Sequence, residues 1–156
     1  MFERLAINHI SIAVRNLDEA IEWYSDVFGL ELLRRTRFDL HELSGESAFV
    51  RRGDIQIELW SLDEVRPVPP ERRDPHSDLL TCGTKHLAFE VSDVQETIDE
   101  LVARQVDIAG VQRVPRGAMV QESHPESAAG PDRAPARAAF VRDPSGTLIE
   151  LLQPIS

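Results

Sequence analysis

The chain has 156 residues, 42% of them hydrophobic and 28% charged, with a formal net charge of −10. This composition is ordinary for a globular protein and fits one domain or two closely packed small modules. The negative charge argues against a nucleic-acid partner, because the arginine clusters at 34–37 and 51–52 are short and lie among acidic residues. Cys82 is the only cysteine, which excludes an internal disulfide and a thiolate zinc site. Without a signal peptide or an apolar stretch long enough for a bilayer, the expected location is the cytoplasm, away from membranes.

The first half predicts a strand, a helix and three further strands. Residues 7–14 alternate β-branched and polar side chains, as in a half-buried strand. Asn16 and Glu19 have the spacing of a capping box and predict a helix that ends at Gly29. The remaining strands are expected near 30–43, 47–52 and 54–62, with a hairpin turn at 51–54.

The second half repeats this order. Residues 8–22 and 85–99 align at an offset of 77, and both segments contain a His, a Val, a Glu and an Ile at matching positions. Each half also closes on the tripeptide Ile-Glu-Leu, at 57–59 and at 149–151. The closing tripeptides are 92 residues apart, so the second half holds about fifteen extra residues.

Two stretches interrupt the repeat. Residues 67–80 contain prolines among charges and are expected to be a linker. Residues 111–137 include a stretch without periodicity that is rich in proline, glycine, alanine and serine, which predicts a loop insertion or lid. We therefore expect a first module at 1–66 and a second at 81–156, together forming one structural domain.

Strand parity selects four polar residues. Successive side chains of a strand point to opposite faces, so the aliphatic residues of the first and last strand of each half would face the helix of that half. The other face of these strands then carries a histidine or a glutamate in every case: His9, Glu58, His86 and Glu150.

Two imidazoles and two carboxylates that converge on one surface would be costly to desolvate without a partner. A divalent cation satisfies them, and nitrogen and oxygen donors without thiolate suit Mn, Fe, Co, Ni or Zn. Taken singly, each residue has an ordinary structural interpretation as a hydrogen-bonded or solvent-facing strand residue. The recurrence of the same pair in both halves favours the metal. His41, His76 and His124 show no such correspondence and are interpreted as loop or surface residues.

Three segments carry a resemblance to a known family: 8–14 with 28–30, 83–91, and 139–151. In these the chain resembles the vicinal oxygen chelate superfamily, which includes glyoxalase I, methylmalonyl-CoA epimerase, extradiol dioxygenases, and fosfomycin- and bleomycin-resistance proteins. The resemblance implies an α+β fold of two tandem βαβββ modules that pair into a curved mixed sheet around a metal-binding cleft. It also implies metal ligands on the first and last strand of each module, which match His9, Glu58, His86 and Glu150.

A set of four ligands is similar to that of glyoxalase I and the epimerases. The implied function is that of an isomerase, epimerase or lyase that moves a proton next to a carbonyl through a metal-stabilised enediolate. Glu150 or Glu58 would be the base. Residues 59–62 lack the Asn-Trp-Gly pattern of many bacterial glyoxalases, and the Asp-Pro-Ser-Gly turn at 143–146 lacks the pattern typical of the epimerases. The substrate therefore stays open, as a small molecule with a carbonyl or vicinal oxygens.

Two alternatives stay open. An Fe(II) extradiol-type dioxygenase would have Glu58 as an extra ligand, and a non-catalytic small-molecule binding (resistance) protein would need no metal. Relatives of this kind are commonly homodimers, which we also expect here. Other polar residues could reach the cleft, although a structural role is favoured for them: His41, Glu42, Glu46 and Glu90. Trp60 and Leu152 are expected to line the cleft or to pack in the core.

Overall fold

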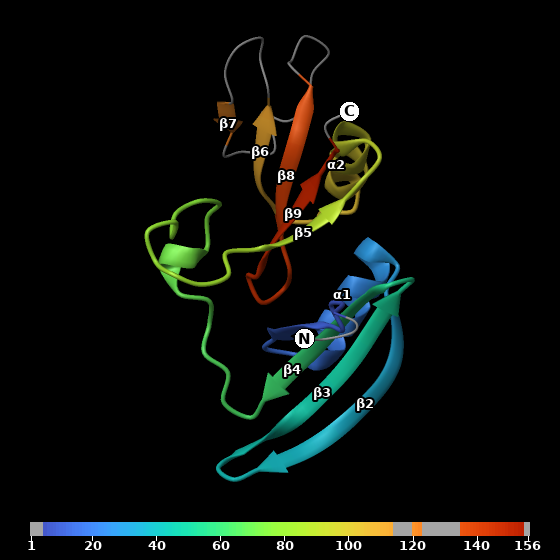
Figure 1. Cartoon of the computed structure of the whole chain (residues 1–156), viewed down its shortest axis with the longest axis vertical. Coiled ribbons are helices and arrows are strands. Elements are labelled where there is room, and N and C mark those ends of the chain that lie inside the picture. The colour runs from blue at the N-terminus through green and yellow to red at the C-terminus, as the bar shows by residue number, and fades with distance from the viewer. Residues whose placement is uncertain (1–4, 114–119, 123–134, 155–156) are drawn as a thin grey trace. The chain divides into compact units, whose positions relative to one another are not determined.

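The computed structural model describes residues 5–113, 120–122 and 135–154, and the chain divides into two compact units, Met1–Pro67 and Val68–Ser156 (Figure 1). Each unit combines one α-helix with one open mixed sheet, so the predicted α+β class is confirmed. Among the described residues, no helix is long and apolar enough to span a membrane.

The first unit has the predicted order strand, helix and three strands. Its elements are β1 (Ile10–Ala13), α1 (Leu17–Phe28), β2 (Glu31–Leu40), β3 (Leu43–Arg52) and β4 (Ile55–Leu62). The sheet order is β1-β4-β3-β2, with β1 parallel to β4 and the other pairs antiparallel. Three boundaries differ from the prediction by three residues or more, and one of them is the end of β2, at Leu40 rather than at residue 43. The first strand begins at Ile10 rather than at residue 7, and β3 begins at Leu43 because a two-residue turn joins it to β2.

Helix α1 is fixed at both ends by the residues that the sequence indicated. The side-chain oxygen of Asn16 accepts a hydrogen bond from the backbone N–H of Glu19 at 3.1 Å. Gly29 adopts a left-handed conformation with φ of 64°, which ends the helix at little steric cost. The helix buries Leu17, Ala20 and Tyr24 and packs on β3 and β4.

The second unit repeats this order with one strand added. Its elements are the 3₁₀ turn η1 (Pro70–Arg72), β5 (Leu87–Glu90), α2 (Val94–Ala103), β6 (Ile108–Arg113), β7 (Val120–Glu122), β8 (Ala136–Arg142) and β9 (Leu148–Leu152). The sheet order is β5-β9-β8-β6-β7, and β5 runs parallel to β9 as β1 does to β4. Strand β7 lies within the expected insertion at 111–137. Residues 114–119 and 123–134 of that insertion, with His124, lie outside the described residues, and so does most of the expected lid.

Helix α2 has the same cap as α1. The Asp93 carboxylate accepts a hydrogen bond from the backbone N–H of Glu96 at 2.9 Å. The helix buries Val94, Ile98 and Leu101 and packs on β8 and β6. The cap and the apolar stripe that the sequence repeat predicted are therefore present in both units.

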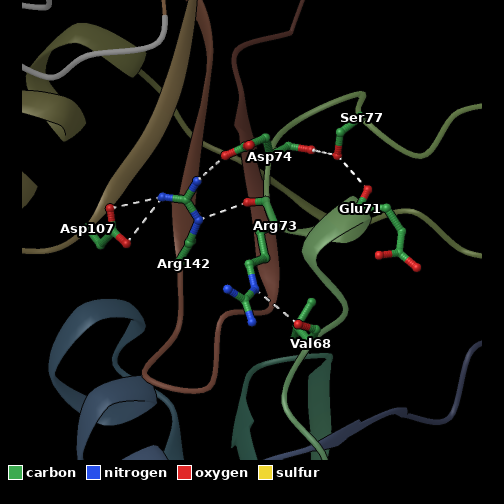
Figure 2. Close-up of polar contacts among 7 residues, drawn as sticks. All are labelled: Val68, Glu71, Arg73, Asp74, Ser77, Asp107 and Arg142. Carbon is green, nitrogen blue, oxygen red and sulfur yellow. Dashed lines mark hydrogen bonds and ion pairs between the residues drawn. The ribbon is translucent and has the colours of Figure 1, made fainter.

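The guanidinium of Arg142 connects the segment before β5 to the second sheet through hydrogen bonds (Figure 2). Arg142, at the end of β8, donates to the backbone oxygen of Arg73 at 2.9 Å and to the carboxylate of Asp74 at 2.8 Å. Its third nitrogen donates to both oxygens of Asp107, at 3.1 and 3.2 Å. The segment that the sequence predicted as a linker thus belongs, from Val68 on, to the second unit and has specific contacts within it.

Candidate metal centre

In the first unit, the fold brings His9 and Glu58 together. His9 lies directly before β1, and Glu58 lies on the neighbouring parallel strand β4. The His9 Nε2 and Glu58 Oε2 atoms are 3.4 Å apart, and the side chains are 34% and 12% exposed. The predicted pair is therefore formed, with the carboxylate largely covered and the imidazole partly open to solvent.

The orientation of the His9 ring is set by its neighbour in the chain. The His9 Nδ1 atom lies 2.7 Å from the side-chain oxygen of Asn8. Since an amide oxygen can only accept, Nδ1 carries the proton of this hydrogen bond, and in a neutral ring Nε2 keeps its lone pair. That lone pair lies next to the Glu58 carboxylate at a distance that is long for a hydrogen bond. Two electron-pair donors side by side suit a cation bound between them.

The second unit forms the equivalent pair. His86 lies directly before β5, and its Nε2 atom is 2.9 Å from Oε2 of Glu150 on β9. The side chains are 29% and 15% exposed, close to the values of the first pair. The registers also match, because Ser11 is the strand partner of Glu58 and Ala88 is the partner of Glu150. Both pairs therefore occupy the same place in their sheets.

One hydroxyl distinguishes the pairs. The Ser11 hydroxyl donates a hydrogen bond to Oε2 of Glu58 at 2.9 Å. The corresponding residue of the second unit is Ala88, which has no polar side chain. The carboxylates therefore have different partners at hydrogen-bond distance: the Ser11 hydroxyl for Glu58, and His86 Nε2 for Glu150.

A phenylalanine lies beside each pair, which the sequence interpretation missed. Phe49 is the strand partner of Glu58, and its ring meets that of His9 edge-on with the centroids 5.3 Å apart. Phe140 is the partner of Glu150, with its ring centroid 5.4 Å from that of His86. The tetrapeptide Ala-Phe-Val-Arg occurs at 48–51 and again at 139–142, and this repeat would have identified both aromatic residues.

His76 and His41 have different surroundings. His76 was interpreted as a loop or surface residue, and it is exposed. Its ring nevertheless contacts Phe140, with centroids 5.4 Å apart, and its Nε2 lies 2.5 Å from the side-chain nitrogen of Gln112. His41 is exposed in the turn between β2 and β3.

The secondary candidates lie apart from the two pairs or are exposed. Glu46 accepts a hydrogen bond from Arg35, which lowers the pKa of the Glu46 carboxyl, and Arg35 also binds Asp18 of α1. Glu46 therefore belongs to the helix side of the sheet. Glu42 and Glu90 are exposed. Trp60 lies two residues after Glu58 and packs against Phe38, and Leu152 is 43% exposed.

Each unit supplies two donors. Within the described parts of the chain, no group of three or more His, Cys, Asp or Glu side chains is placed to hold a metal ion. Two protein donors are fewer than the three or four that bind transition metals in most proteins. Neither pair is by itself a complete set of ligands for such a metal.

Comparison with known proteins identifies a family. Residues 6–151 match the family model of the glyoxalase/bleomycin resistance protein/dioxygenase superfamily. A lactoylglutathione lyase of Neisseria meningitidis is 32% identical over 145 residues, which cover 93% of this chain and 88% of the relative.

Solved structures agree in fold. A glyoxalase family protein from Enterococcus faecalis has a TM-score of 0.65 at 22% identity, over 94% of this chain and 96% of that one. The fosfomycin resistance protein FosX of Listeria monocytogenes, in complex with Mn(II) and a dihydroxypropylphosphonic acid, has a TM-score of 0.62 at 16% identity, over 99% and 95% of the two chains. Together with the repeated strand–helix–strand units, the match over nearly the whole sequence shows that this chain belongs to the glyoxalase/bleomycin resistance protein/dioxygenase superfamily.

Proposed function

We propose that this protein is a divalent-metal-dependent enzyme of the glyoxalase type, an isomerase, epimerase or lyase that moves a proton next to a carbonyl group. The observation that carries the proposal is the recurrence of one histidine–glutamate pair at equivalent register positions in both units. The lactoylglutathione lyase among the relatives supports the same class of reaction. The substrate would be a small molecule with a carbonyl or vicinal oxygens.

The donor chemistry fits a first-row divalent metal. His9 and His86 would each provide Nε2, and Glu58 and Glu150 would each provide a carboxylate oxygen, a set that suits Mn, Fe, Co, Ni or Zn. When bound, such an ion would polarise the substrate carbonyl and make the adjacent C–H bond more acidic. FosX, which shares the fold, is a precedent because its structure contains Mn(II).

The two carboxylates are not equivalent as bases. Ser11 holds Glu58 through a hydrogen bond to Oε2, whereas Ala88 leaves the corresponding side of Glu150 without a hydroxyl. A carboxylate that moves a proton has to change its contacts during the reaction, and Glu58 would have to give up the Ser11 hydrogen bond to do so. We therefore assign the proton transfer to Glu150 and an orienting role to Glu58.

The proposal also concerns the oligomeric state of the protein. Since each unit offers two donors, the pairs would combine either within one chain or between the chains of a homodimer. We propose a cytoplasmic homodimer, as the family resemblance implies.

The test begins with metal content. Elemental analysis of the purified protein should give about one divalent metal per chain, and His86→Ala should lose it. His41→Asn is the matched control, because His41 is an exposed histidine with φ of 56°, a conformation that asparagine tolerates. Parent protein without stoichiometric metal would overturn the proposal.

The reaction can be tested separately with S-lactoylglutathione in D₂O. The metal-loaded protein should incorporate deuterium at the lactoyl α-carbon, and chelation or Glu150→Gln should abolish it. Oxygen consumption with a catechol that survives Glu58→Ala would instead identify a ring-cleaving dioxygenase. A metal-free protein whose small-molecule affinity is unchanged by His9→Ala would identify a non-catalytic binder.

A further inference from the structure

An irregularity in the first sheet places one arginine on the sheet face that carries Glu58. Between β2 and β3, Leu32 pairs with Val50 but Arg34 pairs with Phe49, so Leu33 is an extra residue. Without this bulge, alternation would place Arg34 on the helix side of the sheet. With it, Arg34 stands on the same face as Phe49 and Glu58. Bulges that redirect a side chain are frequent next to functional sites.

Arg34 ends a row of side chains that crosses all four strands. The register places Arg34 beside Phe49, Phe49 beside Glu58, and Glu58 beside Ser11. The Arg34 guanidinium carbon lies 4.2 Å from the centroid of the Phe49 ring, and the same ring contacts His9. Strands β2 and β4 are two strand spacings apart, about 10 Å, so one small molecule can reach both Glu58 and Arg34.

The charge of Arg34 is available to a ligand. Among the residues that the structure describes, no carboxylate lies within ion-pair distance of its guanidinium. Its neighbour Arg35, on the other face, is bound by Asp18 and Glu46. The fold therefore neutralises one arginine of this pair and leaves the other stacked on an aromatic ring.

The second unit shows that the fold does not require an arginine at this point. Strand β6 has the same irregularity, because Ile108 pairs with Val141 and Gly110 pairs with Phe140. Gly110 thus occupies the position that corresponds to Arg34. Because the bulge also forms with glycine at this position, sheet geometry does not explain why the first unit has the charged side chain of Arg34 there.

We propose that Arg34 binds an anionic group of the substrate, a carboxylate or a phosphonate-like oxyanion, while the vicinal oxygens of that substrate bind at the metal. This inference rests on the proposed function. A guanidinium presents two parallel N–H groups that match the oxygens of such anions, and stacking on Phe49 holds its plane in place. Arg34 would then select anionic substrates over neutral ones of the same length.

The experiment uses three hydroxamic acids that chelate metals through vicinal oxygens and differ at the far end. Succinic monohydroxamic acid carries a carboxylate, 3-phosphonopropionohydroxamic acid carries a phosphonate, and the carboxamide analogue of the first is neutral. Their dissociation constants for the Mn(II)-loaded protein are measured by calorimetry, after the metal content of each sample has been determined. Parent protein should bind at least one anionic probe about tenfold more tightly than the neutral one.

Variants separate the role of Arg34 from general effects of charge. Arg34→Gln should reduce the preference to less than twofold while its metal content and its affinity for the neutral probe match the parent. Arg37→Gln is the matched control: Arg37 is exposed on the same strand but pairs with Glu46, on the helix side. It should keep the full preference. Arg34→Lys should keep part of it, because the charge remains.

The outcomes are distinguishable. Metal-loaded parent protein without a preference for either anion, or an unchanged preference in Arg34→Gln, would overturn the assignment of Arg34 and leave the metal centre intact. Parent protein that holds no metal would overturn the proposed function and this inference together. If only the phosphonate or only the carboxylate is preferred, the result supports the inference and identifies the anion.

Discussion

Single residues make the two histidine–glutamate pairs unequal. Both pairs lie at equivalent places beside a phenylalanine, yet the Glu58 carboxylate receives a hydrogen bond from Ser11 and the strand partner of Glu150 is Ala88. A repeated site whose two carboxylates have different neighbours can assign different tasks to them. This difference is testable without knowledge of the substrate.

We expect Ser11→Ala to weaken metal binding about tenfold, because partners that orient a ligand carboxylate typically contribute a factor of this size. The measurement is a competition titration of the metal against a chelator of known affinity. Ser25→Ala, an exposed serine on α1, is the control and should bind metal as the parent does. Equal affinities of Ser11→Ala and the parent would show that the hydrogen bond does not orient a ligand.

The sequence predicted the four candidate ligands but not their surroundings. Parity and the internal repeat sufficed to predict that each histidine lies beside its glutamate, because alternation holds over β4 and β9 and the histidines lie directly before β1 and β5. The role of Phe49 could not be separated from core packing, since an apolar strand residue has the same pattern in either case. Arg34 was not predicted, because the bulge reverses the alternation of side chains between the two faces of the sheet. Nothing in the sequence of residues 32–34 indicates that a bulge lies there.

At the scale of elements, caps and repeats were predictable and long-range contacts were not. Both helices begin at the residues that the sequence indicated, because a cap is a local hydrogen bond. The segment before β5 has no periodicity, so its attachment to Arg142 and the contact of His76 with Phe140 could not be anticipated. Such contacts depend on how distant strands align.

In the same segment, the Asp78 carboxylate lies between two cationic side chains, those of Arg72 and Lys85. The carboxylate is only 8% exposed and lies 2.8 Å from Arg72 Nε and 3.4 Å from Lys85 Nζ. A hydrogen bond from Thr81, together with Lys85 and Arg72, lowers the pKa of Asp78 below its ordinary value. Lys85 directly precedes His86, so this network also fixes the approach of the chain to the candidate ligand.

A pH series tests that network. Because the Asp78 pKa is lower in the folded protein, its ionised form stabilises the fold above the ordinary aspartate pKa, near 4, and this contribution disappears as pH falls through the lower, folded value. Asp78→Asn should therefore reduce the free energy of unfolding at pH 7 and converge with the parent at strongly acidic pH. Urea unfolding measures both, with Asp63→Asn as an exposed control. A difference that is constant with pH would contradict the assignment.

At the scale of the whole molecule, one chain contains two copies of the same unit, and each copy carries one histidine–glutamate pair. Similarity to the superfamily covers both copies, from residue 6 to residue 151. The proposal that both pairs bind one metal ion makes a prediction that two independent metal sites would not make. Loss of either pair should have the same consequence for metal binding as loss of both.

We therefore expect the double variants His9→Ala/Glu58→Gln and His86→Ala/Glu150→Gln each to lose bound metal, because the remaining two donors fall short of a three-ligand set. Elemental analysis after gel filtration measures this, and circular dichroism checks that both variants fold. A variant that keeps the metal of the parent would place the centre in one unit alone. An equimolar mixture of the variants then decides the assembly: recovery of metal requires donors from two chains, and no recovery requires that one chain supplies all four.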